Sequence, residues 1–295
     1  MPMSRYFFSA VIFLSIASGL LFPNVTVLWK DYQNLLLALL MFFSALRVEK
    51  KDLEKANHRQ LLVLLLFVFV LMPLLSLPFK LTDPMTFIGV LFALASPSAA
   101  ATAFFTSFLG GDIALGVAIS FIASLLSIVT LPATVYLLGG AAGSIDNNKI
   151  FTILIEVIII PILAALISKK LFKRLVESIN RYREYQLIVM FLLASNIIGV
   201  SYGVIAGNEY LFLQQTAVIF LMLLFGGALA YLFGTRYGKK SAVTFFVATS
   251  VKNAMLSFAI VLKLFGATAV LPMVANLVAQ FILMALFEIV GCKIL

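Results

Sequence analysis

The sequence is poor in the residues on which metal, redox and soluble-enzyme chemistry depend. Its 295 residues include one cysteine and one histidine. These two residues, Cys292 and His58, cannot form a disulfide framework and are too few to hold zinc or an iron–sulfur cluster. The sequence also has no glycine-rich phosphate loop, no paired aspartates of the kind that bind a magnesium diphosphate, and no nucleophile with a histidine in reach. We therefore expect no enzymatic activity, no bound metal and no cofactor.

Charged residues are scarce as well, whereas hydrophobic residues dominate. They make up 11% and 63% of the chain, respectively. Apolar windows of about 20 residues, long enough to cross a ~30 Å hydrocarbon layer as a helix, recur along the whole sequence. The sequence therefore predicts an all-α membrane protein with ten transmembrane helices, at 6–23, 33–47, 60–79, 85–109, 113–138, 150–168, 186–206, 211–234, 241–264 and 268–290.

The positive charges gather in alternate loops. If the N-terminus is cytoplasmic, sixteen of the 21 Lys and Arg residues lie in cytoplasmic segments and four lie outside. The positive-inside rule then predicts an inner-membrane protein with both termini in the cytoplasm and an even number of spans. The net charge of +9 follows from this topology, so the expected partners are the lipid bilayer and a small molecule, with no nucleic acid and no obligatory protein partner. A cleaved signal peptide over Arg5–Gly19, which would leave nine spans, is the alternative.

The ten predicted spans divide into two halves of five. The loop-like segment Gly139–Asn148 separates residues 1–143 from residues 144–295. Because five is odd, the halves would have opposite orientations, as in the inverted repeats of secondary transporters. A shift of 155 residues superimposes the halves and sets Pro97 opposite Lys252 and Ser98 opposite Asn253.

Lys252 lies near the middle of the ninth predicted span. Its nearest charged neighbours in sequence, Lys240 and Lys263, are roughly 16 to 18 Å away along a helix. A charge at that depth costs at least ~2.5 kcal/mol and usually faces a cavity or a partner. We therefore expect Lys252 to carry the function.

Two of the spans carry signals of interruption. The fourth is interrupted at Ser96-Pro97-Ser98, because proline lacks an amide donor, and a simple packing kink is the alternative there. The ninth is polar at Thr249, Ser250, Lys252 and Asn253. If both helices unwind, their freed backbone groups and helix ends would converge on a ligand site near the midplane.

Four other polar residues inside the spans are candidate site residues. Glu156 is expected either to face solvent or to line the cavity and pair with Lys252. Asn276 and Gln280 are four residues apart on one helix face, so they would bond the unwound segment or the substrate, or only a neighbouring helix. Asn196 is expected to line the cavity.

Several segments resemble the bile acid:sodium symporter family. They are Leu40–Leu53 (LMFFSALRVEKKDL), the Met72-Pro73 pair, Gly89–Leu138 with its Ser96-Pro97-Ser98 interruption, and the Lys252-Asn253 pair. The resemblance implies a panel domain of helices 1, 2, 6 and 7, a core domain of helices 3–5 and 8–10, and broken helices 4 and 9 that cross. It also implies transport of an organic anion with two sodium ions.

The same resemblance shows that the sodium sites are degenerate. The family's span-nine pattern Glu-x-Gly-x-Gln-Asn places Ala248 at the glutamate and Lys252 at the glutamine. The family's Ser-Asn sodium pair falls on Thr102 and Ala103, and its span-three glutamine falls on Val68. Among the matched positions, only Thr102 and Ser120 keep a usable oxygen.

Sodium requires several oxygen ligands, and a nearby ammonium would repel it. We therefore expect a secondary transporter that carries an organic anion, such as a carboxylate, by alternating access without sodium, with Lys252 replacing a sodium ion. If the lysine releases its proton during the cycle, the proton is the coupling ion. A sodium-coupled symporter of the same family and a non-transporting membrane sensor are the alternatives.

Overall fold

The protein is described from a computed structural model that covers residues 7–81, 84–139, 146–181, 184–266 and 269–294. Within these ranges the chain consists of helices and short connections and contains no β-strand. One isolated antiparallel bridge joins Ser98 to Lys252. The predicted all-α class is therefore confirmed, whereas the predicted repeat boundary at 143 lies outside the described residues.

Five helices are long and apolar enough to cross a membrane, and a sixth is added if two helices that meet at a 103° bend, Ala10–Leu21 and Pro23–Arg47, form one span. Three further apolar helices, Thr86–Ala95, Ala254–Phe265 and Leu271–Phe287, are shorter. These lengths indicate a multi-pass membrane protein. The number of unbroken helices long enough to span a membrane, among the described residues, is smaller than the ten spans predicted. The five long helices are His58–Leu81, Ile113–Gly139, Asn148–Leu171, Tyr185–Ala206 and Glu209–Tyr237.

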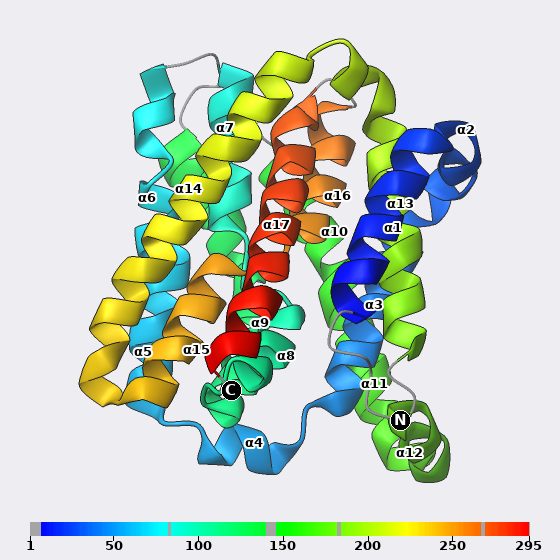
Figure 1. The fold of residues 1–295 in the computed structure, drawn as a ribbon. Helices are drawn as coiled ribbons and strands as arrows, with labels where there is room; N and C mark the ends of the chain where they lie inside the picture. The colour runs from blue at the N-terminus through cyan, green and yellow to red at the C-terminus, as the bar shows by residue number, and fades with distance from the viewer. Residues whose placement is uncertain (1–6, 82–83, 140–145, 182–183, 267–268, 295) are drawn as a thin grey trace.

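One group of helices packs around α13, which contacts α1, α2 and α3 (Figure 1). α3 also packs along α11, which continues from α10 through a π-helical turn. The group comprises α1 (Phe7–Leu21), α2 (Pro23–Thr26), η1 (Val27–Tyr32), α3 (Gln33–Arg47), α10 (Asn147–Leu154), η4 (Ile155–Ile159), α11 (Ile160–Leu171), α12 (Lys173–Arg181) and α13 (Glu184–Ala206).

The second group packs around α14, which runs along α15 and α17, and around α9, which contacts α4, α7 and α8. It comprises α4 (Lys50–Lys55), α5 (His58–Leu66), η2 (Phe67–Leu71), α6 (Met72–Leu74), η3 (Leu77–Leu81), α7 (Pro84–Ala95), α8 (Ala101–Phe108), α9 (Ile113–Gly139), α14 (Glu209–Gly234), η5 (Thr235–Tyr237), α15 (Lys239–Ser250), α16 (Ala254–Phe265) and α17 (Leu271–Ile294).

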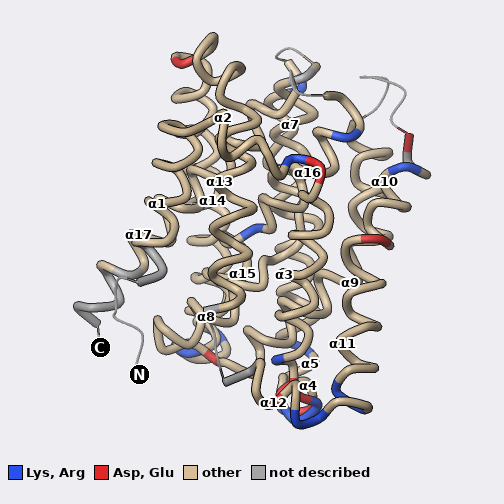
Figure 2. The backbone as a smooth tube through the Cα atoms, turned by 90° about the vertical axis from the view of Figure 1, so that its right-hand side faces the viewer, with Lys and Arg blue, Asp and Glu red and all other residues tan. Residues whose placement is uncertain are grey.

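Local chemistry sets where several helices begin. The side chains of Asn57 and Asp146 cap α5 and α10 by accepting hydrogen bonds from amides of the first turn. The basic residues gather at the end of the bundle that carries α4 and α12, where Figure 2 shows most of the Lys and Arg positions. The two ends of the bundle therefore differ in charge, as the sequence predicts.

Candidate functional site

The chain leaves the helical conformation at the two predicted places, near the middle of the bundle. α7 ends at Ala95 and α8 begins at Ala101, whereas α15 ends at Ser250 and α16 begins at Ala254. Pro97 lacks the amide that would continue the first helix. At the second break, Asn253 starts α16 by accepting a hydrogen bond from the Leu256 amide at 3.2 Å.

The two breaks hydrogen-bond to each other. The Asn253 amide donates to the Pro97 carbonyl at 2.8 Å, and the Ala99 amide donates to the Val251 carbonyl at 3.0 Å. The Ser98 hydroxyl donates to the Ala248 carbonyl at 2.6 Å. Backbone groups freed by the breaks are thus satisfied across the crossing, as their burial in an apolar bundle requires.

Lys252 is buried at this crossing, with 1% of its surface exposed. Its ammonium donates to the Val68 carbonyl at 3.1 Å. Val68 lies in the π-helical turn η2, where the Met72 amide bonds to the Phe67 carbonyl. In the same pattern, the Val68 carbonyl would accept a hydrogen bond from the backbone nitrogen of residue 73. Pro73 has no amide hydrogen to donate. The π turn and the proline together leave the Val68 carbonyl open to the lysine.

No carboxylate pairs with Lys252 among the described residues. The three ion pairs found there are Lys50–Glu54, Lys51–Glu49 and Lys263–Glu156. A buried charge without a counter-ion is rare and marks a functional position in membrane proteins. Among the described residues, the Lys252 side chain is therefore hydrogen-bonded only to a neutral group.

The prediction that Glu156 pairs with Lys252 or lines the cavity is wrong. Its carboxylate lies 3.6 Å from the Lys263 ammonium and accepts a hydrogen bond from Asn34 at 3.5 Å. Glu156 is partly solvent-exposed and belongs to η4, which follows α10. The alternative of a solvated role holds, because an exposed position spares the carboxylate the cost of desolvation.

Gln280 bonds directly to the unwound segment. Its side-chain oxygen accepts from the Lys252 amide at 2.8 Å, and its side-chain nitrogen donates to Asn276 at 3.0 Å. The spacing of four residues on α17 brings these two amides together. The Asn276 nitrogen and the Thr249 hydroxyl are buried and have no hydrogen-bond partner among the described residues.

The remaining polar candidates bond to nearby backbone. The Thr102 hydroxyl lies 3.4 Å from the Val251 carbonyl, and the Ser250 hydroxyl donates to the Leu223 carbonyl at 3.0 Å.

The expectation that Asn196 lines the cavity is wrong. Asn196 is fully buried, donates to the Thr26 carbonyl at 2.6 Å and accepts from Gln33 at 2.5 Å. These bonds tie α13 to α2 and α3, so Asn196 serves helix packing.

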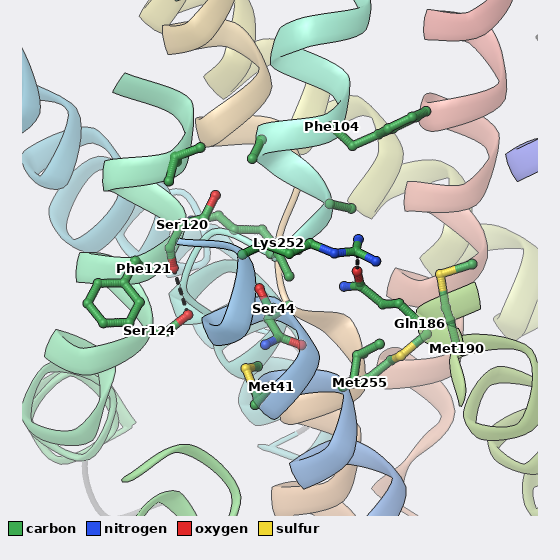
Figure 3. A pocket seen from close by; sticks show the side chains of 18 of the residues that line it. Met41, Ser44, Phe104, Ser120, Phe121, Ser124, Gln186, Met190, Lys252 and Met255 are labelled. Atoms are coloured by element: carbon green, nitrogen blue, oxygen red, sulfur yellow. Dashed lines mark hydrogen bonds between the residues drawn. The ribbon is translucent and has the colours of Figure 1, made fainter. Parts of the chain in front are cut away.

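A cavity of about 460 Å³ extends from the crossing toward the end of the bundle that carries α4 (Figure 3). Near the crossing it is lined by Lys252, Asn253 and Gln280, and Ala103 and Ser120 also line it. Near α4 it is lined by Arg47, Val48, Phe108, Ile113 and Gln186. Its size is within the usual range for a small-molecule site.

Sequence reasoning missed Arg47 and Gln186 as cavity residues. Both lie where a helix begins or ends, and in the sequence Arg47 is one basic residue among several in a segment predicted to be cytoplasmic. The Arg47 guanidinium donates to the Gln186 side-chain oxygen at 2.5 Å. No local pattern indicates this contact, since the two residues are 139 positions apart.

The sequence is similar to that of a known family and of a bacterial protein. A sequence profile of the Sodium Bile acid symporter family matches residues 34–208, from α3 to the end of α13. The protein named "Uncharacterized sodium-dependent transporter YocS" from Bacillus subtilis (strain 168) is 24% identical over 221 residues, which cover 73% of this chain and 67% of the relative. The profile match includes the first break at Pro97 but not the second, so Lys252 lies beyond it.

Proposed function

Because the chain belongs to the sodium bile acid symporter family, and is therefore a membrane transporter of that family, we propose that it carries an organic anion by alternating access without sodium. The Lys252 ammonium supplies the positive charge that a sodium ion supplies in sodium-coupled members.

The contact between Lys252 and Val68 carries this proposal. The ammonium bonds to a backbone carbonyl at a position where the family resemblance implies a sodium ligand. The side chains of Ala248, Ala103 and Val68 offer no oxygen. A hard cation would therefore lack ligands in the same space and would be repelled by the ammonium.

The full architecture of ten spans in two inverted repeats, residues 1–143 and 144–295, is part of the proposal. The shift of 155 residues pairs Pro97 with Lys252 and Ser98 with Asn253. The antiparallel bridge between Ser98 and Lys252 joins these two matched segments and so supports the repeat. In this arrangement α7 with α8 and α15 with α16 each form one broken span. Of the ten proposed spans, the first, second, sixth and seventh form the panel. The basic end of the bundle faces the cytoplasm.

The cavity and the ion pair between the two groups of helices lie on different sides of the crossing, which supports alternating access. The cavity reaches from the crossing toward the basic end. On the opposite side, the Lys263–Glu156 ion pair joins α16 of the proposed core to η4 of the proposed panel. This arrangement matches a conformation open to the cytoplasm, with the outer side closed.

Transport in proteoliposomes tests the proposal. We expect uptake of a carboxylate substrate to proceed at the same rate, within about twofold, when potassium or choline replaces sodium, because the side chains of Ala248, Ala103 and Val68 supply no oxygen ligand. Strict sodium dependence would support the sodium-coupled alternative, which the name of the Bacillus relative favours, and would overturn the role given to Lys252. A pH gradient imposed without sodium separates proton coupling from facilitated exchange.

Replacing Pro73 with alanine is expected to reduce transport by about 10- to 100-fold. An amide hydrogen at residue 73 can bond to the Val68 carbonyl and so compete with the Lys252 ammonium for it. Loss of a hydrogen bond to a charged group corresponds to a change of that size. The initial rate of tracer uptake, normalised to reconstituted protein, measures the effect.

Pro161→Ala is the matched control for this variant. Pro161 also follows a π-helical turn, η4, in which the Ile160 amide bonds to the Ile155 carbonyl. No lysine side chain bonds to the corresponding Glu156 carbonyl among the described residues. We expect nearly unchanged uptake for Pro161→Ala, and equal losses in both variants would contradict the role given to the Val68 carbonyl.

A further inference from the structure

The cavity is lined by only two charged residues of the described chain, Arg47 and Lys252, and no Asp or Glu side chain lines it. Lys252 directs its ammonium to the Val68 carbonyl, and Val68 is fully buried and does not line the cavity. The cation of Lys252 is therefore engaged outside the cavity wall. Arg47 is the other cationic side chain of the cavity lining.

Arg47 is held in place from two directions. It is the last residue of α3, and its guanidinium donates to Gln186 at the start of α13. The Lys169 ammonium caps the same end of α3 by donating to the Ala45 carbonyl at 2.8 Å and the Val48 carbonyl at 2.5 Å. The backbone at the end of α3 is thus held by α11, and the Arg47 side chain is held by α13.

The chemistry of this pair suits a carboxylate. A guanidinium presents its donors as a planar fork that binds both oxygens of a carboxylate. The side-chain nitrogen of Gln186 has no hydrogen-bond partner among the described residues, so it adds a donor beside the guanidinium.

The walls of the cavity suit an apolar body. Four methionines line it, together with several alanines and phenylalanines, and Figure 3 shows Met190 and Met255 close to Gln186. Methionine side chains adapt to apolar groups of different shape. The methionines are Met41, Met190, Met255 and Met284.

We propose that Arg47 and Gln186 bind the carboxylate of the transported anion at the end of the cavity near α4, while its apolar body extends toward Asn253 and Gln280. The substrate is then a monocarboxylate with an apolar body, oriented with its charge toward the basic end of the bundle. This inference rests on the proposed transport function and assigns the orientation of the substrate and its anchoring residues.

The test measures binding to the purified full-length protein with four matched pairs of probes. They are the carboxylates and primary carboxamides of cyclohexane, adamantane, naphthalene and decane. We expect the wild-type protein to bind at least one carboxylate at least tenfold more tightly than its amide. Arg47→Gln is expected to weaken carboxylate binding by about 10- to 100-fold and to leave amide binding unchanged. Retained amide binding shows that the variant is folded.

Two further variants sharpen the result. Arg47→Lys keeps the charge but loses the fork, so an intermediate affinity is expected. Arg59→Gln removes an exposed arginine from the same end of the bundle and should change nothing. Equal affinity of wild-type and Arg47→Gln proteins for the carboxylates overturns the inference. So does a wild-type protein that binds none of the four carboxylates, or binds each no better than its amide.

Transport assays separate this inference from the proposed function. If Arg47→Gln takes up the best-bound carboxylate with an unchanged KM, the anchoring role is wrong and the transport function stands. If the wild-type protein binds the carboxylate but shows no flux in proteoliposomes, the transport function is wrong and the binding site stands.

Discussion

Replacing Lys252 with methionine is expected to lower anion uptake by about 100-fold or more. Methionine approximates the length of the lysine side chain but removes the charge, which leaves the buried Val68 carbonyl without its donor. A hydrogen bond to a charged group contributes up to about 3 kcal/mol, which corresponds to about 100-fold, and the loss of the positive charge adds to this effect. Initial uptake rates in proteoliposomes, normalised to incorporated protein, measure the effect.

Folding and charge can be separated in the same experiment. We expect the thermal unfolding midpoint of Lys252→Met to stay within a few degrees of the wild-type value. The substitution relieves the burial of a charge but leaves one carbonyl unsatisfied, and these two effects oppose each other. Lys240→Met, which removes an exposed lysine from the first turn of α15, is the matched control and should transport normally. An unchanged uptake rate in Lys252→Met would remove this residue from the site.

The double substitution Ala248→Glu with Lys252→Gln is expected to make transport depend on sodium. It restores the acidic and amide oxygens that the family resemblance implies at these two positions. With the ammonium gone, the Val68 carbonyl also becomes available as an oxygen ligand. Sodium binds where several oxygens replace its water, so we expect at least about tenfold faster uptake in sodium than in choline, the change that 1.4 kcal/mol of coupling gives.

The two single variants are the controls for this gain. In Ala248→Glu, the new carboxylate lies near the end of α15, four residues before the lysine in the break, and is expected to neutralise the ammonium, which reduces transport without creating sodium dependence. In Lys252→Gln, the positive charge is lost and no acidic ligand replaces it, so uptake should be low with or without sodium. If the double variant folds, as judged by its unfolding midpoint, and shows no response to sodium, the idea that Lys252 occupies a sodium position fails.

Features that depend on local chemistry were predictable from the sequence. The break after Ala95 follows from Pro97, and the break near Lys252 follows from a cluster of polar residues in an apolar span. Membrane spans follow from length and hydropathy in the same way. Among the described residues, five helices are long enough to count as single spans, because the segments interrupted after Ala95 and Ser250 are divided, the first two helices meet at a bend, and Leu271–Phe287 is short.

Predictions about partners were less successful. Asn196 was expected at the cavity, and Glu156 was expected either at the cavity or facing solvent, because each is a polar residue in an apolar helix. Glu156 instead pairs with Lys263, and Asn196 bonds to Thr26 and Gln33. A polar residue inside a span must find a partner, but the sequence does not tell which neighbouring helix supplies it.

The sequence by itself determined that this protein is an all-helical membrane protein with a lysine buried at a helix break. Hydropathy, proline chemistry and charge bias are properties of short segments, so they can be read without knowing how the helices pack. Only the tertiary structure decided what the lysine contacts. Its partner carbonyl at Val68 is 184 residues away, and Arg47 meets Gln186 across 139 residues. Such contacts depend on how α3, η2, α13 and the segment between α15 and α16 pack together, which no local pattern encodes.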